Sequence, residues 1–229
     1  MERQFETSLR DLKEQLVAMA GLVERSIECA TEALTKRDRT KLTQVYEIEE
    51  KVNQAHKAVD ESCVRLLALH QPLAADLRLI VAIIKMNTDL ERMGDQAVNI
   101  AHNSERYLQG EALKPLLDLP LMADLSRVMV RSAIDSFIQK NDSMARQVLV
   151  QDDEVDELKA KIFKDVVEIL KVRGELVEQG LCLILIARNL ERIGDHATNI
   201  AEDVIFAMTG EDIRHPGNME PPRNVYKAK

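Results

Sequence analysis

Aromatic residues are scarce in this chain: they make up 3% of its 229 residues, and tryptophan is absent. The six prolines are confined to positions 72, 115, 120, 216, 221 and 222, so long stretches contain no residue that breaks a helix. The chain is instead rich in alanine, leucine, isoleucine, glutamate, lysine and arginine, which is the composition of long helices. We therefore expect an all-α protein.

Cysteines and long apolar runs are also few. Cys29, Cys63 and Cys182 are odd in number and share no close spacing, which favours reduced packing residues over a disulfide framework or a zinc knuckle. The longest apolar runs, at 79–84 and 181–187, are far shorter than the ~20 residues that span a bilayer. The N-terminus is charged and shows no secretory signal. We expect a soluble cytoplasmic protein.

Acidic residues outnumber basic ones, and the net charge is -8. A nucleic-acid surface needs clustered lysine and arginine, so we expect no nucleic-acid partner. The sequence lacks a G-x-x-x-x-G-K-[ST] loop and a nucleotide-binding glycine fingerprint, and it places no serine or cysteine with a histidine as a nucleophile pair. The sequence thus shows neither a nucleotide-binding nor a nucleophilic catalytic signature, and we expect a surface that either meets basic partners or holds cations.

Apolar residues recur at steps of three and four along six segments, which predicts six amphipathic helices. The segments lie at about 5–34, 45–66, 74–107, 119–140, 142–172 and 176–209. Pro72 suits the first turn of the third helix, and Gly210 suits the C-cap of the last.

The stretch LQGEALKPLLDLP at 108–120 contains one glycine and two prolines and divides the helices into two sets of three. Short connections make successive helices antiparallel neighbours. We therefore predict two pseudo-repeated three-helix bundles, at 1–110 and 115–210, followed by a polar tail at 211–229.

The two halves share a motif: DLERMGDQAVNIA at 89–101 and NLERIGDHATNIA at 189–201 are identical at nine of thirteen positions. Residues four apart lie about 40° apart around a helix, so the acids and the asparagine of each motif form one stripe, turned away from the core. The retained residues include four pairs that a hydrophobic core does not require: Glu91/Glu191, Gly94/Gly194, Asp95/Asp195 and Asn99/Asn199.

A second polar stripe lies on the helix before each motif. It consists of Glu49 and Asn53, with Asp60 two turns on, in the first half, and of Asp152 and Asp156 in the second. Counted from the intervening turns at ~1.5 Å per residue, the two stripes of each half lie level within about one helical turn. We therefore predict one group of carboxylate and amide oxygens in each half.

Such groups repel one another when they are partly desolvated, so a positive charge should lie between them. Arg92 and Arg192 point about 100° further round their helices and cannot fully neutralise the acids. Oxygen ligands suit hard cations such as Mg²⁺, Ca²⁺ or Mn²⁺, and iron also accepts them. Gly94 and Gly194 each cost about 1 kcal/mol relative to alanine, which makes sense if a neighbouring helix or a bound ion needs close access.

These residues resemble the PhoU family of bacterial phosphate-signalling regulators, and the match covers nearly all of the chain. Two copies of the E-x-x-x-D signature in paired three-helix bundles make the resemblance specific. The segments that carry it are EEKVNQAHKAVDESCVRLLALHQPLAADLRL at 49–79, LERMGDQAVNI at 90–100, DDEVDE at 152–157, LERIGDHATNI at 190–200 and GEDIRH at 210–215.

The resemblance implies a non-enzymatic, dimerising cytoplasmic adaptor that is peripheral to a membrane only through its partners. Family members bind multinuclear metal clusters, repress the phosphate-starvation response by coupling a phosphate ABC transporter with its ATPase to a sensor histidine kinase, and affect phosphate uptake. The resemblance leaves the ion open among iron, zinc, nickel, manganese and magnesium, in divalent or trivalent form. Carried over by position, the ligands are Glu49, Asn53, Glu91 and Asp95 at a first site and Asp152, Asp156, Glu191 and Asp195 at a second, with Asn99 and Asn199 auxiliary. The neutral amide of Asn53 predicts that the first site is weaker or holds fewer ions.

Two other functions remain open from the residues. A metal-free helical scaffold would leave the acids as solvated faces. A di-iron carboxylate oxidase needs inward E-x-x-H pairs, but Gly94 and Gly194 stand where the histidines belong. His196 is predicted to be an ordinary surface histidine, and His56 a weak optional ligand.

Overall fold

The computed structural model describes residues 2–111, 113, 116 and 118–213. This part of the chain is all-α, as predicted, and contains no strand. Its long helices are α1 (Glu2–Thr35), α2 (Thr40–His70), α3 (Ala74–Tyr107), α4 (Leu119–Gln139), α5 (Asp142–Val172) and α6 (Val177–Thr209), and a short 3-10 turn, η1 (Gly174–Leu176), joins the last two.

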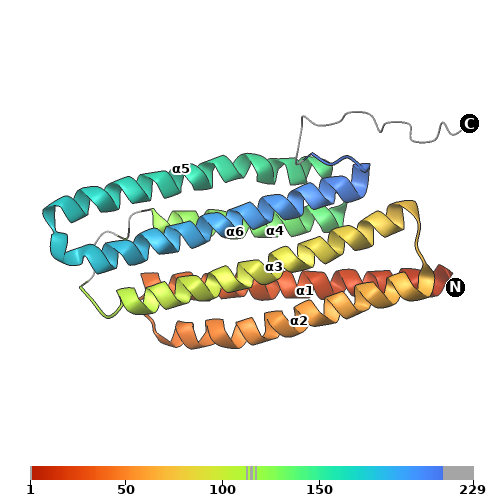
Figure 1. Ribbon diagram of the computed structural model, residues 1–229, viewed down its shortest axis with the longest axis horizontal. Helices are drawn as coiled ribbons and strands as arrows, with labels where there is room; N and C mark the ends of the chain where they lie inside the picture. The colour runs from red at the N-terminus through yellow and green to blue at the C-terminus, as the bar shows by residue number, and fades with distance from the viewer. Residues whose placement is uncertain (1, 112, 114–115, 117, 214–229) are drawn as a thin grey trace, which may run out of the picture.

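The helices form two antiparallel three-helix bundles that lie side by side along the long axis of the molecule (Figure 1). The first bundle contains α1, α2 and α3, and the second contains α4, α5 and α6. The bundles meet where α3 packs against α6 and α1 against α4. The pseudo-repeated arrangement predicted from the sequence is therefore present.

Each helix buries one apolar stripe. On α1 the stripe includes Leu16, Met19, Val23 and Ile27, none of which is exposed. Fully burying one such side chain contributes about 1.5–3 kcal/mol, so packing rather than helix propensity holds the bundles together. The three cysteines are buried and reduced, as predicted. No described helix is long and apolar enough to cross a membrane.

Most helix ends lie close to the predicted boundaries, but α2 (Thr40–His70) extends beyond the predicted 45–66 at both ends, and Pro72 is placed differently. Gly210 closes α6 with φ 78°, and its N–H donates to the Phe206 carbonyl at 2.8 Å. Pro72 does not enter the first turn of α3, because Leu73 is extended (φ -120°, ψ 161°) and the helix begins only at Ala74. Of the predicted tail at 211–229, residues 214–229 lie outside the described part.

Polar side chains join the two bundles at the contact between α3 and α6. Nδ1 of His196 lies 2.8 Å from Oδ1 of Asp89, and Lys85 Nζ lies 3.4 Å from Oδ1 of Asp203. His196 is only 8% exposed. Its prediction as a surface histidine is wrong, because α3 of the other bundle covers its side of α6 and the sequence pattern within one half does not show that contact.

Candidate metal centres

Four side chains from α2 and α3 meet in what we term the first cluster: Glu49, Asn53, Glu91 and Asp95. The Asn53 amide donates to Oε1 of Glu49 at 2.9 Å, whereas Oε2 of Glu49 is buried without a hydrogen-bond partner. Burial raises the pKa of the Glu49 carboxyl, and the negative charges of Asp95 and Glu91 raise it further against the opposing Asn53 hydrogen bond. The cluster therefore carries more negative charge than its own hydrogen bonds offset.

The second cluster is built from α5 and α6 and consists of Asp152, Asp156, Glu191 and Asp195. Burial raises the pKa of Asp152 to about 6, with the charges of Asp195, Asp156 and Glu191 adding to the effect. Burial also raises the pKa of Asp195, and Glu191 and Asp156 act in the same direction. The structure thus brings all four predicted carboxylates of this half into one electrostatic group.

A glycine lies beneath each cluster. A Cβ atom at Gly94 would lie 3.1 Å from Oε2 of Glu49, and one at Gly194 would lie 3.1 Å from Oδ1 of Asp152. Both distances are tighter than ordinary contacts of a Cβ atom. The two glycines therefore let a carboxylate from the neighbouring helix approach the backbone of α3 or α6, which explains why both motifs carry this helix-weakening residue.

The second cluster also contains a cation that the sequence analysis missed. Lys159 Nζ lies 3.0 Å from Oδ1 of Asp156 and also contacts Oε1 of Glu191. Its position three residues after Asp156, on the same side of α5, was the signal that could have revealed it. Arg92 and Arg192 form no ion pair with any residue that the structure describes, in keeping with their predicted direction.

The matching position in the first half, one turn beyond Asn53, is His56. Its ring lies 3.3 Å from the Asn87 carbonyl and 3.5 Å from Asp60, so the structure places it beside the first cluster rather than in it. Asp60 likewise contacts Asn87 rather than the cluster acids.

Comparison with known proteins identifies the family. The family model described as "PhoU domain" matches residues 16–104 and 119–204, one match in each bundle. The chain belongs to the PhoU family. The resemblance predicted from the repeated motif is thereby confirmed.

Curated PhoU relatives match along nearly the whole chain. A phosphate-specific transport system accessory protein PhoU homolog from Pseudomonas putida is 38% identical over 218 residues, covering 95% of this chain and 85% of that protein. A homolog of the same description from Aquifex aeolicus is 36% identical over 207 residues, which cover 90% of this chain and 94% of that protein.

Solved PhoU structures share the fold. The crystal structure of PhoU from Pseudomonas aeruginosa superposes with a TM-score of 0.87 at 36% identity, covering 90% of this chain and all of that chain. The phosphate transport system regulatory protein PhoU from Streptococcus pneumoniae gives 0.85 at 27% identity, over 92% of this chain and all of that one.

The donor set suits the ions that the PhoU resemblance implies. Oε2 of Glu49 is a buried carboxylate oxygen without a hydrogen-bond partner, and an unsatisfied oxygen of this kind suits a hard cation. In the described part of the chain, however, no three His, Cys, Asp or Glu side chains already have the spacing of a metal site. An ion would therefore bind with changes of side-chain rotamer and, in the second cluster, with release of Lys159.

The two asparagines expected as auxiliary ligands lie differently. The Asn199 amide lies 3.3 Å from Oδ1 of Asp89 and so faces the contact between the bundles. Asn99 is exposed, and its carbonyl accepts a hydrogen bond from Asn103. The structure gives neither of them a hydrogen bond to a cluster carboxylate among the residues it describes, and their ligand role stays a prediction.

Proposed function

We propose that this PhoU family member is a metal-binding adaptor that couples a phosphate ABC transporter to a sensor histidine kinase. In that role it represses the phosphate-starvation response and takes part in the control of phosphate uptake. The names of its relatives, accessory and regulatory proteins of phosphate transport, support the transporter half of the proposal. The homodimer and the cytoplasmic location expected from the sequence belong to the same proposal.

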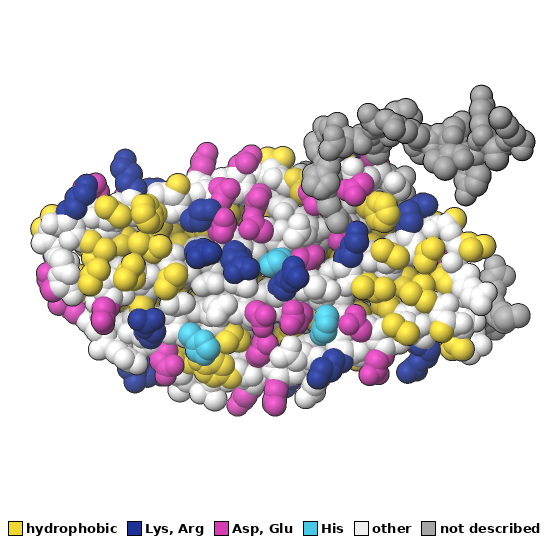
Figure 2. Space-filling model, in the orientation of Figure 1, with side chains coloured by type: hydrophobic (Ala, Val, Ile, Leu, Met, Phe, Trp, Pro, Cys, Tyr) yellow, Lys and Arg dark blue, Asp and Glu magenta, His cyan; other side chains and the backbone are white. Residues whose placement is uncertain are grey.

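The observation that carries the metal half is the repeated approach of a carboxylate to a helix glycine, Glu49 to Gly94 and Asp152 to Gly194. Acidic side chains gather over α2–α3 and over α5–α6 on one face of the molecule, so both clusters can serve one docking surface (Figure 2). A bound ion would offset the repulsion among the acids and offer open coordination positions to oxygen ligands of a partner or of phosphate.

The residues of the chain divide the work. Glu49, Glu91 and Asp95, with the amide oxygen of Asn53, would hold an ion in the first cluster, and the four carboxylates of the second cluster would hold one there. Lys159 offsets one of the two negative charges of Glu191 and Asp156 until an ion displaces its ammonium group. The glycines keep the approach to the backbone open.

Elemental analysis of protein purified without added metal tests the metal half. We expect wild type to retain metal and Asp152→Ala/Asp195→Ala to lose the share held by the second cluster. The matched control, Glu154→Ala/Glu157→Ala, removes two exposed acids of α5 outside the cluster and should retain the wild-type content. Equal metal content in wild type and Asp152→Ala/Asp195→Ala would reject the second site.

The adaptor half is tested by affinity purification of the tagged chain from phosphate-replete cells. We expect a sensor histidine kinase and a transporter ATPase to be recovered, and less of the kinase from phosphate-starved cells. Recovery of neither protein would reject the adaptor function, whatever the metal content. Light scattering of the purified chain tests the homodimer.

A metal-free scaffold is the second candidate, and Lys159 favours it. Its ammonium already supplies a positive charge to the second cluster, so part of the acidic charge there is offset without a metal. Wild-type protein that contains no metal by elemental analysis yet still recovers its partners would establish this alternative.

A further inference from the structure

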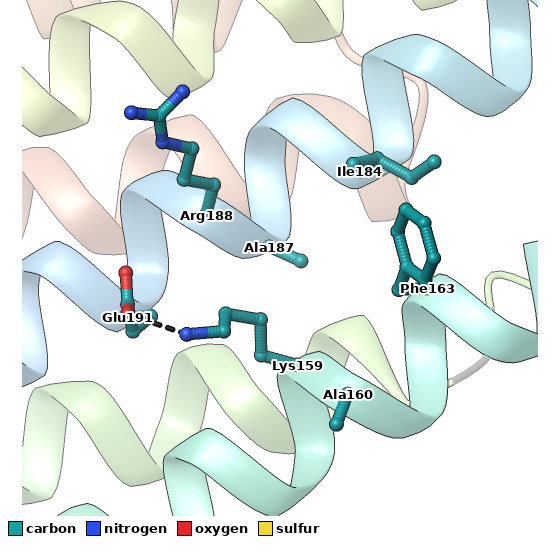
Figure 3. Close-up of a pocket in the computed structure, with 7 residues that line it drawn as sticks. All are labelled: Lys159, Ala160, Phe163, Ile184, Ala187, Arg188 and Glu191. Carbon is teal, nitrogen blue, oxygen red and sulfur yellow. Dashed lines mark hydrogen bonds and ion pairs between the residues drawn. The ribbon is translucent and has the colours of Figure 1, made fainter.

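A groove between α5 and α6 lies next to the second cluster (Figure 3). It contains a cavity of about 440 Å³, within the range of binding pockets. Ala160 and Phe163 of α5 and Ile184 and Ala187 of α6 line its apolar part. Phe163 points toward Ile184 and is 55% exposed, so water reaches a large aromatic side chain there.

The apolar surface continues along α6 toward the turn with α5. Val177, Leu181 and Leu185 are exposed at steps of four residues, and hydrophobic side chains gather at this end of the face (Figure 2). From Val177 to Arg188 the strip is ~16 Å long, or about three helical turns. A contiguous exposed apolar strip of this kind marks an interaction surface more often than a scattered one does.

The first half shows that the fold does not require this groove. Aligning the two clusters places Asp60 at the position of Phe163 and Asn87 at that of Ala187. Asn87 is fully buried, and its amide donates to Oδ1 of Asp60 at 2.8 Å and to the His56 carbonyl at 3.0 Å. The first half thus has polar side chains that hydrogen-bond to each other at these positions, whereas the second half has apolar ones that line a groove.

Charge indicates what the groove accepts. Lys159 is already paired with acids of the second cluster, but exposed Arg188 forms no ion pair with any described residue. Thr88 holds its position in the first half, so this cation is specific to the open groove. Beyond Arg188 the surface turns acidic at Glu191. The adjoining acids and the net charge of -8 disfavour an anionic membrane as the occupant.

We propose that the groove between α5 and α6 binds an amphipathic helix of a partner protein. Apolar side chains of that helix pack on Phe163, Ile184 and Leu181, and an acidic side chain beside them pairs with Arg188. A helix suits a groove three turns long between the antiparallel helices α5 and α6, because side chains one turn apart on one face of the partner helix can all enter the groove. The inference rests on the proposed adaptor role but not on metal binding.

The test uses synthetic 14-residue helical peptides on the full-length protein, by fluorescence polarisation in the presence of EDTA. The peptides share one leucine stripe and carry a single glutamate at each flanking position in turn, and a second set carries lysine instead. We expect one glutamate peptide to bind about fivefold tighter than its lysine counterpart. Arg188→Glu should reverse that preference.

A double variant transplants the polar residues of the first half. Phe163→Asp/Ala187→Asn should weaken binding of the preferred peptide about tenfold or more. Val64→Asp, an exposed valine on α2 of the other bundle, is the matched control and should bind like wild type. Thermal melts establish that each variant is folded, and Arg188→Glu, a surface change, keeps the test valid if the double variant does not fold.

Failure to bind any peptide, equal affinity for the two charge sets, or the same loss in Val64→Asp would overturn the proposal. Because the assay is run without metal, these outcomes leave the metal content of the protein as a separate result. Unchanged metal with no peptide binding would reject the groove alone.

Discussion

The two halves of the molecule keep one feature and differ in what surrounds it. Each places a carboxylate of one helix against a glycine of the next, Glu49 on Gly94 and Asp152 on Gly194. The first cluster then has an amide, Asn53, and no lysine, whereas the second has a fourth carboxylate and Lys159. Four carboxylates and one lysine leave the second cluster with the same formal charge, -3, as the three carboxylates of the first.

Both halves contain the duplicated motif, and in both a carboxylate lies against a helix glycine. We propose that this shared contact serves cation binding. The compensation of charge differs between the halves, and so do the positions beside the clusters, where one half has the polar Asn87 and the other has Ala187 in an apolar groove. The halves therefore share the contact between carboxylate and glycine and differ in charge compensation and in the surface offered to a partner.

The largest effect should come from adding side chains at Gly94 and Gly194, where a carboxylate of the neighbouring helix lies against the backbone; we call these two contacts the glycine cradles. Gly94→Leu and Gly194→Leu each insert a side chain where even a Cβ atom is tight, and each should destabilise the protein by about 1–3 kcal/mol and reduce its metal content. Urea denaturation measures the first effect. Gly21→Ala in α1 is the control: nothing lies within 4 Å of its Cβ position, so it should stabilise by about 1 kcal/mol. Stabilisation by the leucines would contradict the cradle.

Asp152 should make the metal-free protein less stable as the pH rises. Its pKa is about 6 in the folded protein against 3.8 ordinarily, so the folded state binds more protons between these values. Stability therefore falls as pH rises through this window, by about 1–2 kcal/mol once solvent screening is allowed for. Asp152→Asn should remove that part of the pH dependence and stabilise the metal-free protein at pH 7.5. Denaturation curves from pH 4 to 8 in EDTA that coincide for both proteins would refute this.

Asn53 is the residue by which the ligands of the first cluster differ from the four carboxylates of the second. Asn53→Asp adds a fourth carboxylate without a lysine and removes the hydrogen bond to Glu49. We expect the free energy of unfolding of the metal-free protein to fall by about 1 kcal/mol and the affinity of the first cluster for Mn²⁺ to rise. Calorimetric titration in a background of Asp152→Ala/Asp195→Ala isolates this site. An unchanged affinity would show that Asn53 does not limit it.

The smallest effect concerns Lys159. Lys159→Gln removes a partly exposed ion pair, so the free energy of unfolding of the metal-free protein should fall by only about 0.5–1 kcal/mol. The second cluster should then bind Mn²⁺ several-fold tighter, because the ion no longer displaces an ammonium group. Lys164→Gln, an exposed change one turn further along α5, should alter neither quantity. Weaker Mn²⁺ binding in Lys159→Gln would mean that the lysine supports the site.

Most of the fold could be predicted because helix periodicity is a local property. The range 74–107 predicted for α3 matches Ala74–Tyr107. The acids of two antiparallel neighbouring helices could be placed at the same height along the bundle from the rise per residue of a helix. The contact of His196 with Asp89 could not be predicted, because it depends on how one bundle is rotated against the other. The spacing of Lys159 from Asp156 could have predicted an ion pair between these two residues. The contact of Lys159 with Glu191 also depends on the side-chain rotamer, which the sequence does not show.

Native mass spectrometry during titration with Mn²⁺ tests whether the two acidic clusters each bind metal ions. Wild type should take up ions at both clusters, Glu49→Ala/Asp95→Ala and Asp152→Ala/Asp195→Ala should each lose one set, and combining all four changes should abolish specific uptake. The same number of bound ions in wild type and in the fourfold variant would contradict metal binding at the clusters.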